Sequence, residues 1–194
     1  MKKLVGYAAV FWDGSPGSEY RLGPDAVERI MPSAFDSSLN GPDDIAAAWN
    51  HNMDFLLGSR SAGTLKLSKD AKGLRYEIDF DETDPHHQSV MAKVKRGDVP
   101  GSSFSFAIVR ENVRRDKGIF IRELFDVRLY ELGPVWRPAY SGTSANARSD
   151  AKYGSVRWGM ENPAECIEFD QRQARLKEIE SQQVRDRLWE LTRQ

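Results

Sequence analysis

The stretch Arg96–Arg110, Arg-Gly-Asp-Val-Pro-Gly-Ser-Ser-Phe-Ser-Phe-Ala-Ile-Val-Arg, predicts a turn that opens into a strand. Gly97, Pro100 and Gly101 interrupt regular structure, and from residue 104 onward apolar and small side chains alternate. Ser103 therefore lies at the start of the predicted strand, just after a glycine that leaves room for a ligand. Such a serine is a nucleophile if a base and an orienting acid reach it; otherwise it ends a turn, as serines commonly do.

Most of the chain before residue 140 has the patterns of β-strands. Leu4–Trp12 is a continuous apolar run that ends in Asp13–Gly17, which predicts a buried strand followed by a loop. Leu74–Asp81 alternates apolar and charged residues and, with Gly63–Ser68, predicts a hairpin. Ile119–Leu132 is a long alternating segment that we expect to be bulged or bent.

A few short helices are expected between these strands. Thr83 or Asp84 is the predicted N-cap of a helix that has Pro85 in its first turn and ends at Gly97. Pro24–Met31 predicts a second, short helix. Ile45–Asn52 reads as a strand that carries His51 at its end, although its alanines leave a short helix as an alternative. The predicted class is α+β, a mostly antiparallel β-barrel-like domain with two or three short helices.

The composition changes at Ser141 and suggests three regions. Residues 1–140 form the patterned domain, and residues 141–163, which begin with the Ser/Thr/Asn/Ala-rich Ser141–Ser149, read as a flexible linker. Residues 164–194 are highly charged, with apolar residues only loosely at helical spacing. We expect a helical or disordered tail there, either a solvated helix or a segment that binds a partner.

The overall composition is that of a soluble domain. The 194 residues are 40% hydrophobic and 29% charged, and the net charge of −1 gives no reason to expect a nucleic-acid surface. No apolar run approaches the roughly 18 residues of a membrane span, so we expect neither a membrane anchor nor a signal peptide. The single Cys166 fits a reducing compartment and a cytoplasmic protein.

His51, Glu77 and Ser103 each fall on a predicted strand or at a strand end. A serine hydrolase needs a base that takes the hydroxyl proton, and an acid that fixes the imidazole tautomer and stabilises the imidazolium. Spacing in the sequence does not show that the three residues meet. From the residues alone, a histidine that merely ends a strand and a solvated glutamate on a strand face are the better explanations of the first two.

A metal hydrolase is an alternative that would use His51, His86, His87 and Asp84. Adjacent histidines on one helix diverge by about 100°, however, and rarely bind the same ion. We therefore expect no metal and no cofactor.

The chain resembles the tailed-phage prohead proteases, a capsid-maturation family related in fold to the herpesvirus assemblin proteases. The resemblance runs from about Val5 to Ser144. It is carried by several short blocks in a fixed order: Gly6–Phe11, Asn50–Asn52, Leu57–Arg60, Gly63–Leu65, Gly73–Glu77, Lys95–Val99, Gly101–Phe106, Tyr130–Val135 and Pro138–Tyr140.

The resemblance implies a serine protease in which His51 is the general base and Ser103 the nucleophile. Glu77 is where such proteases carry their third residue, with Asp79 on the same strand face as second choice. Because the herpesvirus relatives use a second histidine, His86 and His87 are outside candidates. Arg137 stands where the family usually has a small or apolar residue, and backbone N–H groups near it are candidate oxyanion donors.

The resemblance also implies the biology. The substrates would be segments of the scaffold or the major capsid protein, and the protease itself, inside an assembling procapsid in the host cytoplasm. A homo-oligomer is left open. A catalytically silent assembly or scaffold protein with the same fold is the alternative, against which the presence of His51, Ser103 and an acid argues.

Overall fold

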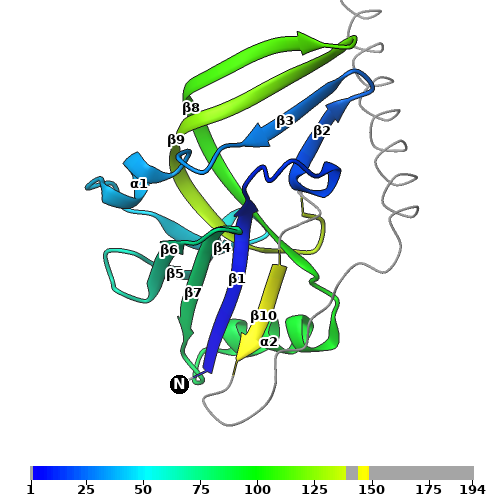
Figure 1. Cartoon of the computed structure of the whole chain (residues 1–194). Coiled ribbons are helices and arrows are strands. Elements are labelled where there is room, and N and C mark those ends of the chain that lie inside the picture. Colours follow the sequence, from blue (N-terminus) through cyan, green and yellow to red (C-terminus); the bar gives the residue numbers. More distant parts are fainter. Residues whose placement is uncertain (1, 139–143, 149–194) are drawn as a thin grey trace, which may run out of the picture. The chain divides into compact units, whose positions relative to one another are not determined.

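The computed structural model describes residues 2–138 and 144–148, and strands dominate this part of the chain. One sheet has four strands in the order β10 (Ser144–Arg148), β1 (Lys2–Val10), β7 (Gly73–Phe80) and β6 (Leu65–Lys69), all antiparallel (Figure 1). The predicted hairpin is confirmed as β6 and β7. The buried side chains of β7 alternate as expected, since Leu74, Tyr76, Ile78 and Phe80 are at most 2% exposed.

The second sheet is built around the long strand β9 (Ile119–Val135). On one edge, β3 (Ala26–Ile30) and β4 (Ala46–Trp49) both run parallel to β9, at different points along its length. β2 (Glu19–Gly23) and β5 (Asn52–Ser59) extend this edge by antiparallel pairing to β3 and β4. The other edge of β9 pairs with β8 (Gly101–Asp116) in a long antiparallel hairpin.

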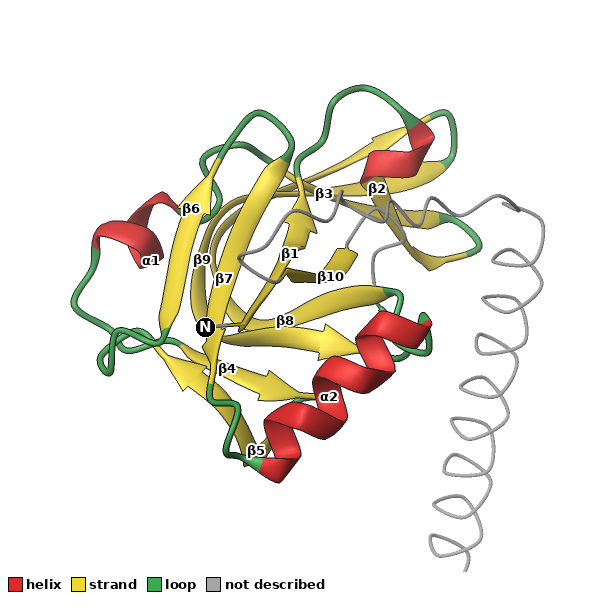
Figure 2. Ribbon diagram, turned by 90° about the horizontal axis from the view of Figure 1, so that it is seen from below, coloured by secondary structure: helices red, strands yellow, loops and turns green. Residues whose placement is uncertain are grey.

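The two sheets share one hydrophobic core. Leu4, Tyr76 and Ile78 from the first sheet belong to the same buried cluster as Leu129 and Leu132 from the second. Figure 2 shows the strands curving around this interior, with α2 (Pro85–Arg96) alongside them. The fold is therefore β-rich with few helices, in agreement with the predicted α+β class.

The boundaries of α2 follow the predicted signals. The Asp84 side chain accepts a hydrogen bond from the backbone N–H of His86, Pro85 occupies the first turn, and Gly97 ends the helix with a left-handed φ of 84°. Val90, Met91 and Val94 are buried on its inner side. Besides α2, the described residues contain the short helix α1 (Asp36–Asn40) and the 3-10 turn η1 (Pro16–Ser18).

The helix predicted over Pro24–Met31 is wrong. Its residues form β3 instead, which pairs with β2 and with β9. A helix of this length has little stability of its own, whereas a strand here gains a partner on both edges and buries Val27 and Ile30. Tertiary pairing therefore overrides the local pattern.

Part of the predicted linker is structured. Residues 144–148 form β10, which pairs with β1 from Lys3↔Arg148 to Tyr7↔Ser144, and Ala145 joins the core. The remaining residues of the linker and the whole predicted tail, 164–194, lie outside the described residues. Within residues 2–138 and 144–148, no helix has the length and apolarity needed to cross a membrane.

Candidate active site

His51 lies at the tip of the hairpin that joins β4 to β5. Trp49 and Asn52 face each other across the strands, so that Asn50 and His51 form a two-residue turn. Their φ angles are 50° and 60°, and positive φ at both central residues is what a type I′ hairpin turn requires. Asparagine suits the first of these positions, but the second favours glycine. A histidine held in this conformation suggests that its side chain serves a function.

Contacts with the end of β9 fix the hairpin tip. The Asn50 backbone N–H donates to the carbonyl of Pro134 (3.2 Å), and the Trp136 backbone N–H donates to Oδ1 of Asn50 (3.1 Å). Directly beside them, β4 passes so close to Gly133 that a Cβ there would lie 2.0 Å from the carbonyl oxygen of Ala48. Only glycine allows this approach, which places His51 next to β9.

We expect the substitution Gly133→Ala to be strongly destabilising. The added methyl group would meet backbone rather than a movable side chain, so β4 or β9 has to shift, and overpacking of this kind costs about 1–3 kcal/mol. Urea unfolding should show a loss in the upper part of that range. Gly17→Ala is the matched control, because a Cβ at residue 17 has no neighbour within 4 Å. Equal stability of the two variants would contradict the argument.

The three serines at the start of β8 point to two different sides. Ser102 is buried, and its hydroxyl is 2.7 Å from that of Tyr76 in the interior; Phe104 also joins the core. Ser103 and Ser105 lie on the opposite face of the strand, because successive residues alternate. In the β8–β9 register, Ser103 is opposite Gly133, and Ser105 is opposite Glu131. Ser103 is 5% exposed.

On that face, an imidazole, a carboxylate and a hydroxyl are in contact. Nδ1 of His51 hydrogen-bonds to Oε1 of Glu131. The Ser105 hydroxyl donates to the same oxygen over 2.5 Å and lies 3.3 Å from the His51 Nδ1. The hydrogen bond to Glu131 is the main cause that raises the pKa of His51 above its usual value, against the opposing effect of partial burial. The Glu131 side chain is only 8% exposed.

Glu77 and Asp79 do not reach His51. Both lie on β7, in the four-stranded sheet, with their side chains on the face opposite the buried Tyr76 and Ile78. Glu77 pairs with Arg75 (2.6 Å) and Lys3 (3.4 Å), and the Arg75 hydrogen bond is the main cause that lowers its pKa. Asp79 is 3.6 Å from Lys3 and 3.8 Å from Lys66. This corrects the expected placement of the acid, since strand alternation turns Glu77 and Asp79 toward these cations.

His86 and His87 lie on the first turn of α2, and among the described contacts neither is a hydrogen-bond partner of His51. The ring of His86 stacks on Phe55, with centroids 4.6 Å apart, and that of His87 stacks on Phe80 at 4.7 Å. Nδ1 of His87 accepts the backbone N–H of Asp81. Among the residues described, no three His, Cys, Asp or Glu side chains are grouped so that they could hold a metal ion.

Sequence reasoning missed Glu131 as the partner of His51. The residue lies in the block Tyr130–Val135 that carries the family resemblance, and it is the only acidic residue of that block. A charged residue enclosed by the apolar Leu129 and Leu132 in a strand is itself a signal, because buried carboxylates are retained only with a partner. Arg137, which stands where the family usually has a small or apolar residue, follows β9 and lies with its guanidinium over the ring of Trp136.

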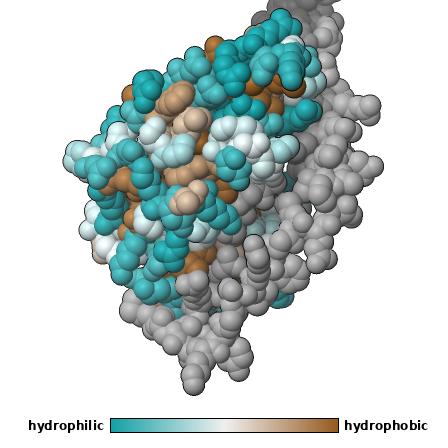
Figure 3. All heavy atoms as spheres, in the orientation of Figure 1, coloured by the Kyte–Doolittle hydropathy of each residue, from teal (hydrophilic) through white to brown (hydrophobic). Residues whose placement is uncertain are grey.

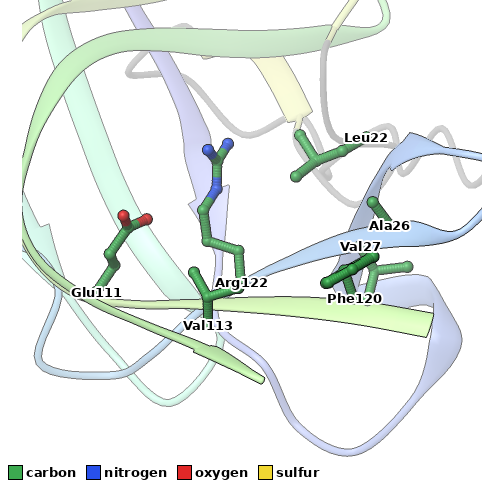
Figure 4. A pocket seen from close by; sticks show the side chains of 7 residues that line it. All are labelled: Leu22, Ala26, Val27, Glu111, Val113, Phe120 and Arg122. Atoms are coloured by element: carbon green, nitrogen blue, oxygen red, sulfur yellow. The ribbon is translucent and has the colours of Figure 1, made fainter. Parts of the chain in front are cut away.

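A hollow of about 240 Å³ lies elsewhere, between the β2–β3 hairpin and the outer halves of β8 and β9 (Figure 4). Its lining is mostly apolar and comprises Leu22, Ala26, Val27, Glu111, Val113, Phe120 and Arg122. None of these residues is a nucleophile or a histidine, so the hollow does not compete as a catalytic site. Figure 3 shows the face seen in Figure 1, which is mostly hydrophilic with separate apolar patches.

Comparisons with known proteins identify the family of the chain. The model of a family described as caudovirus prohead serine protease matches residues 1–155. No curated protein matches the chain significantly. Among solved structures, the crystal structure of KSHV protease in complex with a hexapeptide phosphonate inhibitor is similar, with a TM-score of 0.46 and 14% identity over 77% of this chain and 66% of that chain. The chain thus spans just under two thirds of that protease. Because the family model covers most of its length, the chain belongs to the caudovirus prohead serine proteases.

Proposed function

We propose that Ser103 is the nucleophile, His51 the general base and Glu131 the acid that orients it. The observation that carries this proposal is the hydrogen bond between Nδ1 of His51 and the Glu131 carboxylate. With Nδ1–H directed at Glu131, the other ring nitrogen, Nε2, is left unprotonated to accept a proton. Ser103 lies on the same face of β8 as Ser105, which contacts the ring, and two residues along a strand span about 7 Å. This spacing supports Ser103 as the hydroxyl that Nε2 serves.

The reaction is acyl transfer. As Ser103 Oγ bonds to the scissile carbonyl carbon, its proton passes to Nε2 of His51, and Glu131 stabilises the imidazolium. The proton is then given to the leaving amine as the C–N bond breaks. Water, activated by the same imidazole, hydrolyses the acyl-enzyme and restores the serine. Backbone N–H groups near Arg137, just beyond the end of β9, are our candidates for the donors that stabilise the oxyanion.

The pH dependence should report on His51. The base has to be neutral to accept a proton, and the pKa of His51 is raised by Glu131. We therefore expect the cleavage rate at limiting substrate to rise with pH through a midpoint above about 6.5, the ordinary value for histidine. In Glu131→Gln the carboxylate that raises the pKa is gone, so the midpoint should move to lower pH. A midpoint that is the same in both proteins would exclude the His51–Glu131 pair as its origin.

The His51–Glu131 pair should also make the stability of the folded protein depend on pH, with a trend opposite to that of the cleavage rate. The pKa of His51 is raised in the folded state, so the pair's contribution is fully present below the unfolded pKa. This contribution is lost as pH rises through the pKa that His51 has in the folded protein. Catalysis and this part of the stability therefore change in opposite directions with pH.

As substrates we propose segments of the major capsid protein or the scaffold, cleaved inside the procapsid in the host cytoplasm. Membership of the prohead protease family supports this proposal. We further propose that the chain cleaves itself between its domain and the charged segment 164–194. An exposed, unpaired segment is a better protease substrate than a packed strand.

Self-processing should leave a product of defined length. Residues 144–148 pair with β1, so the cut is expected between residues 149 and 163 rather than anywhere from Ser141 onward. It should release a piece of about 30 to 45 residues. Intact-mass analysis of chain expressed with its capsid proteins should show this shortening in wild type but not in Ser103→Ala or His51→Ala. Full-length chain beside trimmed capsid protein would contradict self-processing and leave the protease assignment. If the capsid protein also stayed whole, a silent assembly role would be favoured.

A further inference from the structure

A second serine hydroxyl, that of Ser105, contacts both members of the His51–Glu131 pair. Its Oγ donates to Oε1 of Glu131 over 2.5 Å and lies 3.3 Å from Nδ1 of His51. The contact follows from the register, because Ser105 and Glu131 face each other directly across β8 and β9. Side chains that face each other in this way lie close enough to interact.

The surroundings of Glu131 make this hydroxyl important. The carboxylate is largely buried, and its second oxygen, Oε2, has no hydrogen-bond partner among the described residues. Both of its donors, the His51 ring and the Ser105 hydroxyl, reach the same oxygen, Oε1. A buried carboxylate is costly to keep ionised without donors. Of the two donors to Glu131, the Ser105 hydroxyl is the one that is not itself a titratable group.

The same hydroxyl helps to define the imidazole tautomer. A serine hydroxyl has one proton and two lone pairs. Because the proton of Ser105 is directed at Glu131, a lone pair is available to the ring nitrogen at 3.3 Å. Nδ1–H of His51 thus has two acceptors beside it, both on its own side of the ring. This arrangement favours the form of the ring in which Nε2 carries no proton.

We propose that Ser105 is a positioning residue, which holds the Glu131 carboxylate and, through it, the tautomer and orientation of the His51 ring. The proposal rests on the proposed roles of Ser103, His51 and Glu131. Under this proposal, the two serine hydroxyls on one face of β8 have different roles. Ser103, opposite Gly133, attacks the substrate, and Ser105, opposite Glu131, supports the base.

Ser105 is poorly placed to be the nucleophile itself. Its proton is already directed at the carboxylate, and it approaches the ring from Nδ1, the nitrogen that Glu131 occupies. A nucleophile has to give its proton to the nitrogen opposite the acid. The geometry therefore favours support of the base over attack.

The test uses a probe that needs no knowledge of the cleavage site. A fluorophosphonate reacts when the nucleophile's oxygen bonds to phosphorus and fluoride leaves, with the hydroxyl proton taken by the base. Its second-order labelling rate therefore measures activation of Ser103. The variants are Ser105→Ala, which removes the hydroxyl, and Ser105→Thr, which keeps it on a residue suited to strands. Ser102→Ala is the control, because it removes a hydroxyl from the same strand on the opposite face.

Ser105→Ala should slow labelling by about 10- to 100-fold, less than the loss of a general base. Ser105→Thr should stay within about fivefold of wild type, and Ser102→Ala should label normally while being less stable. In a Glu131→Gln background, Ser105→Ala should add little, because residues that act as one unit are not additive. That last result separates action through Glu131 from a general effect on folding.

Three results would overturn the proposal. The first is that Ser105→Ala is labelled as fast as wild type. The second is that Ser105→Ala slows labelling as much in the Glu131→Gln background as in wild type. The third is that Ser105→Ala is not labelled at all, while the label in the wild-type protein is found on residue 105. The first two leave the proposed roles of Ser103 and His51 intact. The third, or normal labelling of Ser103→Ala, would instead remove the proposed nucleophile.

Discussion

Ser103→Ala should abolish cleavage of the proposed capsid substrate and labelling by a fluorophosphonate, while the protein stays folded. The substitution removes the oxygen proposed to form the acyl-enzyme, and the neighbouring hydroxyl on that face of β8, that of Ser105, is bound to Glu131. Ser103 is 5% exposed, and replacing a serine at the start of a strand by alanine is usually mild, within about 1 kcal/mol. The loss of activity should therefore reach the background rate with little change in the midpoint of urea unfolding.

Two neighbouring serines provide the controls for this result. Ser102→Ala breaks the buried hydrogen bond to Tyr76 and should cost about 1 kcal/mol of stability while sparing activity. Ser105→Ala should leave a measurable rate. If Ser102→Ala or Ser105→Ala ended cleavage and Ser103→Ala did not, the assignment of the nucleophile would be one or two residues out of register.

Glu131→Gln should lower the cleavage rate by up to about 10⁴-fold, the loss seen when the acid of a serine protease triad becomes an amide. The amide keeps the shape of the side chain but loses the charge that stabilises the imidazolium. It also presents N–H groups that can favour the wrong tautomer of His51. The rate should be measured at saturating substrate, so that the effect on the chemical step is separated from binding.

Glu77→Gln and Asp79→Asn are the matched comparisons. Their side chains pair with Lys3, Arg75 and Lys66 on the outer face of the other sheet, where ion pairs contribute about 0–1 kcal/mol. Both variants should cleave at rates within a factor of about two of wild type. If Glu77→Gln cleaved much more slowly than wild type while Glu131→Gln cleaved normally, Glu77 on β7 would be the acid instead.

The resemblance, not the local pattern alone, named Ser103 and His51, which are two of the three residues proposed here as catalytic. Ser103 follows a Gly-containing turn at the start of an alternating strand, and His51 lies at a strand end. The caps of α2 at Asp84 and Gly97 and the alternation of β7 were predictable from the local pattern itself. Each of these features depends on interactions between residues that are close in the sequence, so a local pattern is enough to predict it.

The partner of His51 depends on register, so only the tertiary structure shows that it is Glu131. If the pairing of β8 with β9 kept the register that it has beside the turn at Lys117 and Gly118, Ser105 would face Tyr130. The pairing slips by one residue between Ser105 and Phe106, so that Ser105 faces Glu131 instead. A slip of one residue exchanges the two faces of a strand, and a bulge leaves little trace in the sequence. For Glu77 the strand pattern was predicted correctly, but the pattern does not say which residues of other strands lie beside it.

The approach of β4 to Gly133, which places His51 beside Glu131, likewise joins segments more than 80 residues apart. The sequence by itself predicted the β6–β7 hairpin, the boundaries of α2 and the positions of Ser103 and His51 next to turns, but not β3 or β10. Only the tertiary structure decided which carboxylate meets the imidazole. The physical reason is that strand pairing, bulges and close backbone contacts are set by the packing of the whole core and not by any local pattern.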